Sequence, residues 1–246
     1  MSYCLGIKTH EGLVLASDSR TSAGDQVSLC QKMHIFVVGG ERVFVLLTSG
    51  SLSLSQSVIT LLRKDFDAGG GLATAASLYD AARVVGSTIR RVSDLDREAL
   101  ERDKLSFNCH FVMGGQIRGE EPDLYLIYPQ GNPLRASIDS PYLQIGETKY
   151  GRPILDRGIK YDSTSLEFAA KYALISLDST MRSNSTVGPP VDMLVYRAGD
   201  LELKYHRRLA ASAPDLKEIH LHWEQSPRKA VMELPPIQFE SVENQI

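Results

Sequence analysis

The chain has 246 residues, of which 43% are hydrophobic and 23% charged, so it has the composition of an ordinary globular protein with a sizeable core. Its formal net charge of −3 provides no basic field that would attract nucleic acid or an anionic membrane, and we expect neither partner. No apolar run reaches the length of a membrane span, and the first residues do not resemble a secretory signal. Three cysteines without metal-type spacing argue against a disulfide framework and favour the reducing cytoplasm: Cys4, Cys30 and Cys109.

The first hundred residues predict two pairs of strands followed by two helices. Strands are expected over 3–8 and 13–17, around a turn at Gly12, and then over 33–38 and 42–48, around a pair of glycines. Apolar residues next recur at helical spacing from Leu54 to Phe66, and again from Leu78 to Val92. We expect these two helices to lie side by side on one face of a sheet.

The rest of the chain again predicts strands followed by two helices, and then a last pair of strands. Its expected strands are 107–115, 123–128 and 134–138, its expected helices 149–157 and 165–182, and its final hairpin 191–197 with 201–206. Because neighbouring strands are linked by hairpins, the sequence predicts an α+β fold of two mostly antiparallel sheets, packed together with helices outside. We expect one domain over 1–208. A C-terminal extension over 209–246 would pack on the same domain or on a neighbouring subunit.

Ser2 becomes a candidate nucleophile once Met1 is removed. Its free α-amine would then stand beside its own hydroxyl, so that one residue supplies both nucleophile and base. The unperturbed pKa of an α-amine is about 7.7 to 8.0, which leaves part of it neutral near pH 7. Met-Ser starts are common, however, and position alone leaves open that Ser2 is only a small residue after the initiator.

Three downstream residues give Ser2 a context. The hairpin around Gly12 should return Asp18 to the chain start, because its two strands have nearly equal length. Lys32 precedes the next apolar strand, where its ammonium could pair with Asp18 and lower the pKa of the Ser2 amine. Gly50 lies between a strand and a helix, where its amide could face a developing oxyanion. Each alone has an ordinary alternative, namely a turn former, a solvated lysine and a loop connector.

In this order, these residues resemble the active site of β-type subunits of the proteasome family, which are N-terminal-nucleophile hydrolases. The opening Met-Ser-Tyr-Cys-Leu-Gly-Ile-Lys and the segments 17–24 and 177–184 look like the bacterial Anbu branch of that family. The resemblance implies a four-layer αββα sandwich that hydrolyses peptides or other amides without a cofactor or metal. It also implies homo-oligomers, as rings or helical turns, while an ATPase partner cannot be read from the sequence.

The resemblance assigns roles residue by residue. It gives the nucleophile to Ser2, the charged pair to Asp18 and Lys32, and the oxyanion amide to Gly50. It matches Asp178 to the family's late aspartate at a helix end. Substrate contacts would fall to four further residues, of which the first two bind the substrate backbone and the last two shape the specificity pocket: Thr21, Ser22, Cys30 and Thr48.

Two positions depart from the family pattern. Glu147 or Thr148 stands where a serine is often found near the amine, and a carboxylate there would raise the pKa of the amine. Met181 replaces a second serine. Three functions therefore stay open, namely a peptide-cleaving amide hydrolase, a self-assembling structural subunit with little or no hydrolysis, and an amidase acting on a small non-peptide amide. His220 and His222 could place two imidazoles on one strand face as a metal pair, but no third ligand accompanies them, and we expect both to be structural.

Overall fold

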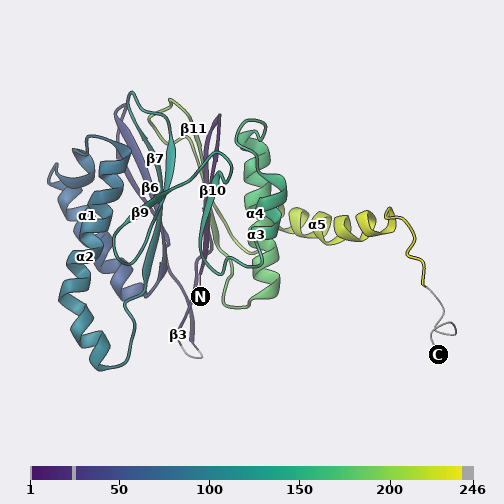
Figure 1. The fold of residues 1–246 in the computed structure, drawn as a ribbon, viewed down its shortest axis with the longest axis horizontal. Coiled ribbons are helices and arrows are strands. Elements are labelled where there is room, and N and C mark those ends of the chain that lie inside the picture. The colour runs from purple at the N-terminus through teal and green to yellow at the C-terminus, as the bar shows by residue number, and fades with distance from the viewer. Residues whose placement is uncertain (1, 24–25, 240–246) are drawn as a thin grey trace.

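Two five-stranded antiparallel sheets pack face to face in the computed structural model, which describes residues 2–23 and 26–239 (Figure 1). The first sheet has the strand order β10-β1-β2-β11-β12 and the second β5-β6-β7-β8-β9. The strands of the first sheet are β1 Tyr3–Thr9, β2 Gly12–Ser17, β10 Tyr142–Gly146, β11 Val191–Arg197 and β12 Tyr205–Leu209. Those of the second are β5 Met33–Val38, β6 Arg42–Gly50, β7 Cys109–Ile117, β8 Asp123–Ile127 and β9 Pro133–Arg135. A separate hairpin joins β3 Arg20–Ala23 to β4 Gln26–Leu29.

Helices cover the outer face of each sheet. α1 (Leu52–Asp67) and α2 (Leu78–Arg102), with a short 3-10 turn η1 (Gly71–Ala73) between them, lie on the second sheet, and α3 (Arg152–Gly158) and α4 (Leu166–Ser183) lie on the first (Figure 1). Serine hydroxyls begin two of these helices, since Ser77 accepts the amide of Asp80 and Ser165 accepts the amide of Phe168. The expected four-layer αββα sandwich is confirmed.

Three apolar clusters fill the spaces between the four layers. β2 shows how one strand supplies two of them, because successive side chains point to opposite faces of a sheet. Leu13 and Leu15 join the cluster between the two sheets, whereas Val14 and Ala16 join the cluster under α3 and α4. The third cluster lies between the second sheet and α1 with α2. Burial on both faces explains why these strands read as nearly continuous apolar runs.

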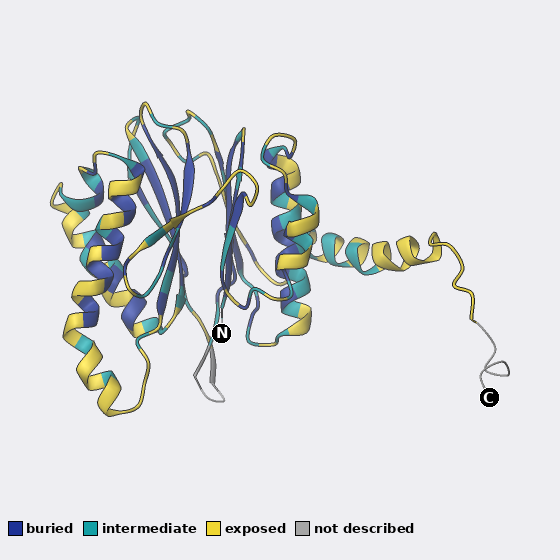
Figure 2. Ribbon diagram, viewed as in Figure 1, coloured by how far each residue is buried: buried dark blue, intermediate teal, exposed yellow. Residues whose placement is uncertain are grey.

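The tail forms a helix, α5 (Pro214–Met232), that projects away from the sandwich (Figures 1 and 2). Leu216 and Ile219 pack on the cluster under α4, but among the described residues no member of α5 is itself buried. His220 and His222 therefore do not share a strand face, because residues two apart on a helix point in roughly opposite directions. The strand geometry considered for this pair is therefore not formed.

The final hairpin also differs from expectation. Its second strand is Tyr205–Leu209 rather than 201–206, because the chain turns at Leu201, which has a φ of +48°, before it pairs with β11. Three strands and one helix were not predicted at all, namely β3, β4, β10 and α5. None of the helices that the structure describes is both long and apolar enough to span a bilayer.

Candidate active site

A cleft of about 580 Å³ contains Ser2, where the start of β1 meets the ends of the two sheets. Of the residues predicted for the site, Ser2, Thr21 and Gly50 line it, together with Thr148. The walls are completed by Ser49, Asn108, His110, Leu126, Tyr128, Gln144, Ile145 and Gly146. The cleft thus brings the chain start, the end of β6 and the end of β10 to one place.

The β1–β2 hairpin carries Asp18 to the chain start. Cys4 pairs with Ser17 in the ladder, so the next residue, Asp18, lies opposite Tyr3 and donates its amide to the Tyr3 carbonyl at 3.1 Å. In return, the Tyr3 amide donates to Oδ1 of Asp18 at 3.0 Å. The carboxylate is therefore fixed one residue away from Ser2.

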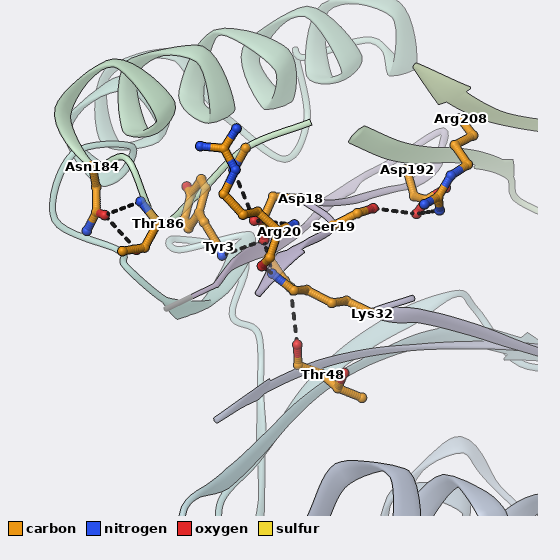
Figure 3. A network of polar contacts seen from close by, with 12 residues as sticks. Tyr3, Asp18, Ser19, Arg20, Lys32, Thr48, Asn184, Thr186, Asp192 and Arg208 are labelled. Atoms are coloured by element: carbon orange, nitrogen blue, oxygen red, sulfur yellow. Dashed lines mark hydrogen bonds and ion pairs between the residues drawn. The ribbon is translucent and has the colours of Figure 1, made fainter. Parts of the chain in front are cut away.

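Four donors surround the fully buried Asp18 carboxylate (Figure 3). Oδ1 accepts from the Tyr3 amide and, at 2.5 Å, from Nζ of Lys32, while Oδ2 accepts at 3.1 Å from the amides of Arg20 and Gly188. Lys32 is itself buried and also donates to the Arg20 carbonyl at 2.5 Å. A buried ion pair persists when its remaining hydrogen-bonding capacity is met in this way.

Two thiols adjoin this ion pair, and both favour the protonated form. Burial raises the pKa of Cys4, an effect that the ammonium of Lys32 partly offsets. Burial likewise raises the pKa of Cys30, which lies beside Thr21. Because the thiolate is the reactive form of cysteine, burial makes both thiols poor nucleophiles at neutral pH.

Gly50 occupies a position that only glycine tolerates. Its φ is +107°, and a Cβ there would lie 2.4 Å from the Asn108 carbonyl oxygen. The same carbonyl accepts the amide of Ser51 at 2.7 Å, so the chain leaves β6 in a fixed direction and enters α1 at Leu52. The Gly50 peptide therefore lines the cleft next to the positive end of a helix dipole.

The end of β10 closes the cleft on the other side of Ser2. Gly146 has a φ of +86°, and a Cβ on it would lie 1.9 Å from the Ser2 carbonyl oxygen. The amide of Glu147 donates to that same oxygen at 2.8 Å. The Glu147 side chain is buried, and its Oε2 accepts from Nδ2 of Asn184 at 2.8 Å.

Asp178 lies elsewhere, and its predicted place at the nucleophile needs correction. Ser176 marks the inner face of α4, since its Oγ lies 2.6 Å from the hydroxyl of Tyr3. Asp178 is two residues further along, about 200° around the helix, and its carboxylate lies 2.9 Å from Nδ1 of His220 on α5. The α4 segment reaches the site instead through Asn184, which follows its last turn. Met181 packs against the apolar cluster under α4.

The structure places three of the four predicted substrate-binding residues, and only Thr21 lines the cleft. Thr21 lines the cleft, and Cys30 lies beside it. Thr48 is buried and links two neighbours through its backbone, because its amide donates to the Lys32 carbonyl at 3.0 Å and its carbonyl accepts from the Cys4 thiol at 3.4 Å. The side chain of Ser22, and Met1 with its predicted removal, lie outside the described residues.

His110 lines the cleft, although no pattern in the sequence marked it as a site residue. Its Nδ1 lies 3.1 Å from Oδ1 of Asn108, and its ring meets that of Tyr128 edge to face. Burial lowers the pKa of His110, so the imidazole is neutral at pH 7. The signal that could have found it is strand register, since His110 pairs with Ser49 directly before Gly50.

Comparisons with known proteins agree with this geometry. The family model described as "Proteasome subunit" matches residues 2–196, about four fifths of the chain. The chain belongs to the proteasome subunit family. Among curated relatives, the proteasome subunit beta of Haloquadratum walsbyi is 27% identical over 205 residues, covering 82% of this chain and 76% of that protein.

Solved structures place this proteasome-family chain in the Anbu branch. It is similar to the helical assembly of the Anbu complex from Pseudomonas aeruginosa, with a TM-score of 0.91 and 42% identity, over 98% of this chain and all of that one. It is also similar to Anbu, the ancestral beta-subunit, from Yersinia bercovieri, with a TM-score of 0.89 and 39% identity, over 97% of this chain and all of that one. The family model ends before α5, whereas these Anbu structures cover nearly the whole chain.

Proposed function

We propose that this proteasome-family chain is an amide hydrolase that acts on peptides, with Ser2 as the nucleophile after removal of Met1. The observation that supports it most strongly is the buried ion pair of Asp18 and Lys32, in which Nζ of Lys32 lies 2.5 Å from Oδ1 of Asp18. The Asp18 carboxylate is bonded to the residue that follows Ser2. Burying two charges is unfavourable unless a function or a fully satisfied network retains them. Here they lie beside the chain start, where Ser2 lines the cleft and carries a hydroxyl.

In the proposed reaction, Oγ of Ser2 attacks the carbonyl carbon of the scissile amide and passes its proton to the free α-amine. The negative charge that develops on the carbonyl oxygen faces the amide of Gly50. When the C–N bond breaks, the ammonium gives that proton to the departing amine, which leaves an ester on Ser2. A water molecule then loses a proton to the α-amine and attacks the ester carbon. The C–Oγ bond breaks, the proton returns to Oγ, and a carboxylic acid is released.

Substrate contacts follow from the same arrangement. Thr21 and Ser22 belong to β3 at the edge of the cleft, where we assign them to the substrate backbone as an added strand would bind. Cys30 and Thr48 are assigned to the specificity pocket. Because all three cysteines have free thiols, we assign the protein to the reducing cytoplasm.

A second candidate function, a self-assembling subunit with little hydrolysis, is favoured by α5. The helix carries exposed apolar side chains, among them Leu221, Val231 and Met232, and its far end projects into solvent (Figure 2). Exposed apolar groups of this kind mark interaction surfaces. The chain resembles a protein solved as a helical assembly, and we propose that it too forms homo-oligomers, in which α5 contacts a neighbouring copy.

Two measurements on the full-length protein test the proposed hydrolysis. Intact mass spectrometry should show the loss of one methionine from the chain, and fluorogenic peptide amides should be cleaved. Ser2→Ala should reduce cleavage by at least about a hundredfold, whereas Ser2→Thr, which keeps the hydroxyl, should retain it. Equal cleavage by wild type and Ser2→Ala would exclude Ser2 as the nucleophile. Absence of any cleavage by assembled protein that has lost Met1 would favour the structural function.

A further inference from the structure

A chain of hydrogen bonds links Ser2 to the segment that follows α4. The Ser2 carbonyl accepts the amide of Glu147 at 2.8 Å, and the Glu147 carboxylate accepts Nδ2 of Asn184 at 2.8 Å. Oδ1 of Asn184 in turn accepts both the amide and the hydroxyl of Thr186, at 2.9 and 2.6 Å. Both Nδ2 and Oδ1 of Asn184 are thus hydrogen-bonded. Glu147 on one side and Thr186 on the other hold the side chain in position.

The same segment also holds the opposite side of Ser2. Two residues after Thr186, the Gly188 amide donates to Oδ2 of Asp18 at 3.1 Å, and the Gly188 carbonyl accepts the amide of Ser19 at 3.2 Å. Figure 3 shows Asn184 and Thr186 on one side of Tyr3 and Asp18, with Lys32 on the other. Segment 184–188 therefore joins the end of β10 to the end of β2 around the chain start.

Glu147 is an unusual residue to bury at this point. A carboxylate has about four acceptor sites, and burial without matching donors is unfavourable. Asn184 supplies one donor to Oε2, while Oε1 lies 3.5 Å from Nζ of Lys149, whose side chain is 66% exposed. Because Gly146 pairs with Tyr3 and the Glu147 amide donates to the Ser2 carbonyl, Glu147 lies opposite Ser2 at the end of β10.

We propose that Glu147 accepts a hydrogen bond from the free amine of Ser2, and that Asn184 holds Glu147 in place for it. Glu147 thereby orients the amine beside the Ser2 hydroxyl. Asn184 acts through Glu147 and is a positioning residue. The inference rests on the proposed function in one respect, namely that Met1 is removed.

The charged and titratable groups around the Ser2 amine determine the direction in which its pKa should shift. Asp18 and Lys32 neutralise each other, and His110 and Cys30 are uncharged at neutral pH. Two cations oppose Glu147, namely Lys149 and the guanidinium of Arg20, which donates to the Ser185 carbonyl at 2.6 Å, but both contacts are exposed and water screens them. Glu147 therefore stabilises the ammonium form and raises the pKa of the amine, so the base becomes available at higher pH than an unperturbed α-amine would.

Selective acetylation of the Ser2 amine tests the inference without requiring turnover. Protein that has lost Met1 would be treated with limiting acetic anhydride between pH 6 and 10, and the N-terminal peptide quantified by mass spectrometry. We expect Glu147→Gln to shift the midpoint of the profile down by about one pH unit. Asn184→Ala should shift it in the same direction by less. Ser185→Ala, an exposed change in the same segment, should match the wild type.

The outcomes separate this inference from the proposed function. Superimposable profiles for wild type and Glu147→Gln, with both proteins folded by circular dichroism, would overturn the role of Glu147. A normal shift together with no peptide cleavage would support the inference and contradict the proposed hydrolysis. Retention of Met1 on all molecules would overturn both, because Ser2 would have no free amine.

Discussion

Helix α4 and the residue that follows it carry two polar regions that differ in their surroundings. Directly after the last turn of α4, Asn184 donates to the buried Glu147 carboxylate, whose residue lies opposite Ser2. On the outer face of α4, Asp178 bonds His220 and Arg182 bonds Glu224, and both partners come from the projecting helix α5. The first region connects the chain after α4 to the end of β10 beside the cleft, whereas the second connects α5 to α4. An acidic residue near a helix end therefore says little about a site until its helical phase is known.

The buried ion pair beside Ser2 and the ion pair on the outer face of α4 also differ in the dielectric around their charges. The side chains of Lys32 and Asp18 are 3% and 0% exposed, whereas those of Arg182 and Glu224 are 59% and 35% exposed. Removing one partner from a buried pair leaves an uncompensated charge, while a solvated pair contributes little to stability. The largest effects of mutation are therefore expected around Ser2.

Lys32→Met should produce the largest effect. It leaves the Asp18 carboxylate buried without its ammonium, and we expect a loss of about 3 to 5 kcal/mol in the free energy of unfolding. Urea denaturation followed by circular dichroism measures this. Arg182→Ala is the matched control on the outer face and should cost less than about 1 kcal/mol. Similar losses for the two variants would contradict the distinction between the regions.

Gly146→Ala should rank second. The new Cβ would require movement of the Ser2 carbonyl, and the residue would also be strained at its positive φ, so we expect a loss of about 3 kcal/mol or more. Gly199→Ala separates the two causes, because Gly199 has a φ of +85° but no described atom within 4 Å of a Cβ. The control should cost about 1 to 2 kcal/mol. If both variants unfold at the same urea concentration, the contact with Ser2 does not constrain β10.

Lowering the pH should reduce the free energy of unfolding through His34, which lies on β5, away from α4. Burial, and then the charge of Arg63, lower the pKa of His34 to about 4. The unfolded chain, where this pKa is near 6.5, binds the proton more readily, so stability is complete above pH 6.5 and falls towards pH 4. The loss is at most about 3 kcal/mol. His34→Gln should flatten this part of the profile in urea denaturation between pH 7 and 5, and an unchanged slope would contradict it.

Asp178→Asn should have the smallest effect. Cleavage and acetylation of Ser2 should stay within about twofold of the wild type, because Asp178 faces α5 rather than the cleft, and the lost contact with His220 is worth about 1 kcal/mol or less. Kinetics with a peptide amide measures this directly. A change in cleavage or acetylation as large as that caused by Asn184→Ala would show that Asp178 acts at the site.

The sequence was sufficient for the four layers and for part of the site. Period-two and helical patterns located most strands and helices, and the nearly equal lengths of β1 and β2 placed Asp18 beside the chain start. The sequence did not predict β10, although Tyr142–Gly146 is bounded by a proline and a glycine, because so short a segment gives a weak pattern. Without β10, the contact of Gly146 and Glu147 with Ser2 could not be foreseen.

Asn184 could not be predicted for a related reason. Its role depends on which way the chain turns after α4, and this is fixed by Thr186 and by the Gly188 amide on Asp18, both non-local consequences of packing. The cleft residues His110 and Tyr128 likewise come together through pairing between β7 and neighbouring strands. Spacing along the sequence carries no information about such register.

The most direct test of the account is to locate the covalent adduct formed with an electrophilic peptide probe. Wild-type protein lacking Met1 would be labelled, digested and sequenced by tandem mass spectrometry, beside Ser2→Ala. The account predicts one adduct, on the oxygen of Ser2, that is absent from the variant. An adduct on Cys30, on Lys32 or on the tail, present equally in both proteins, would contradict it.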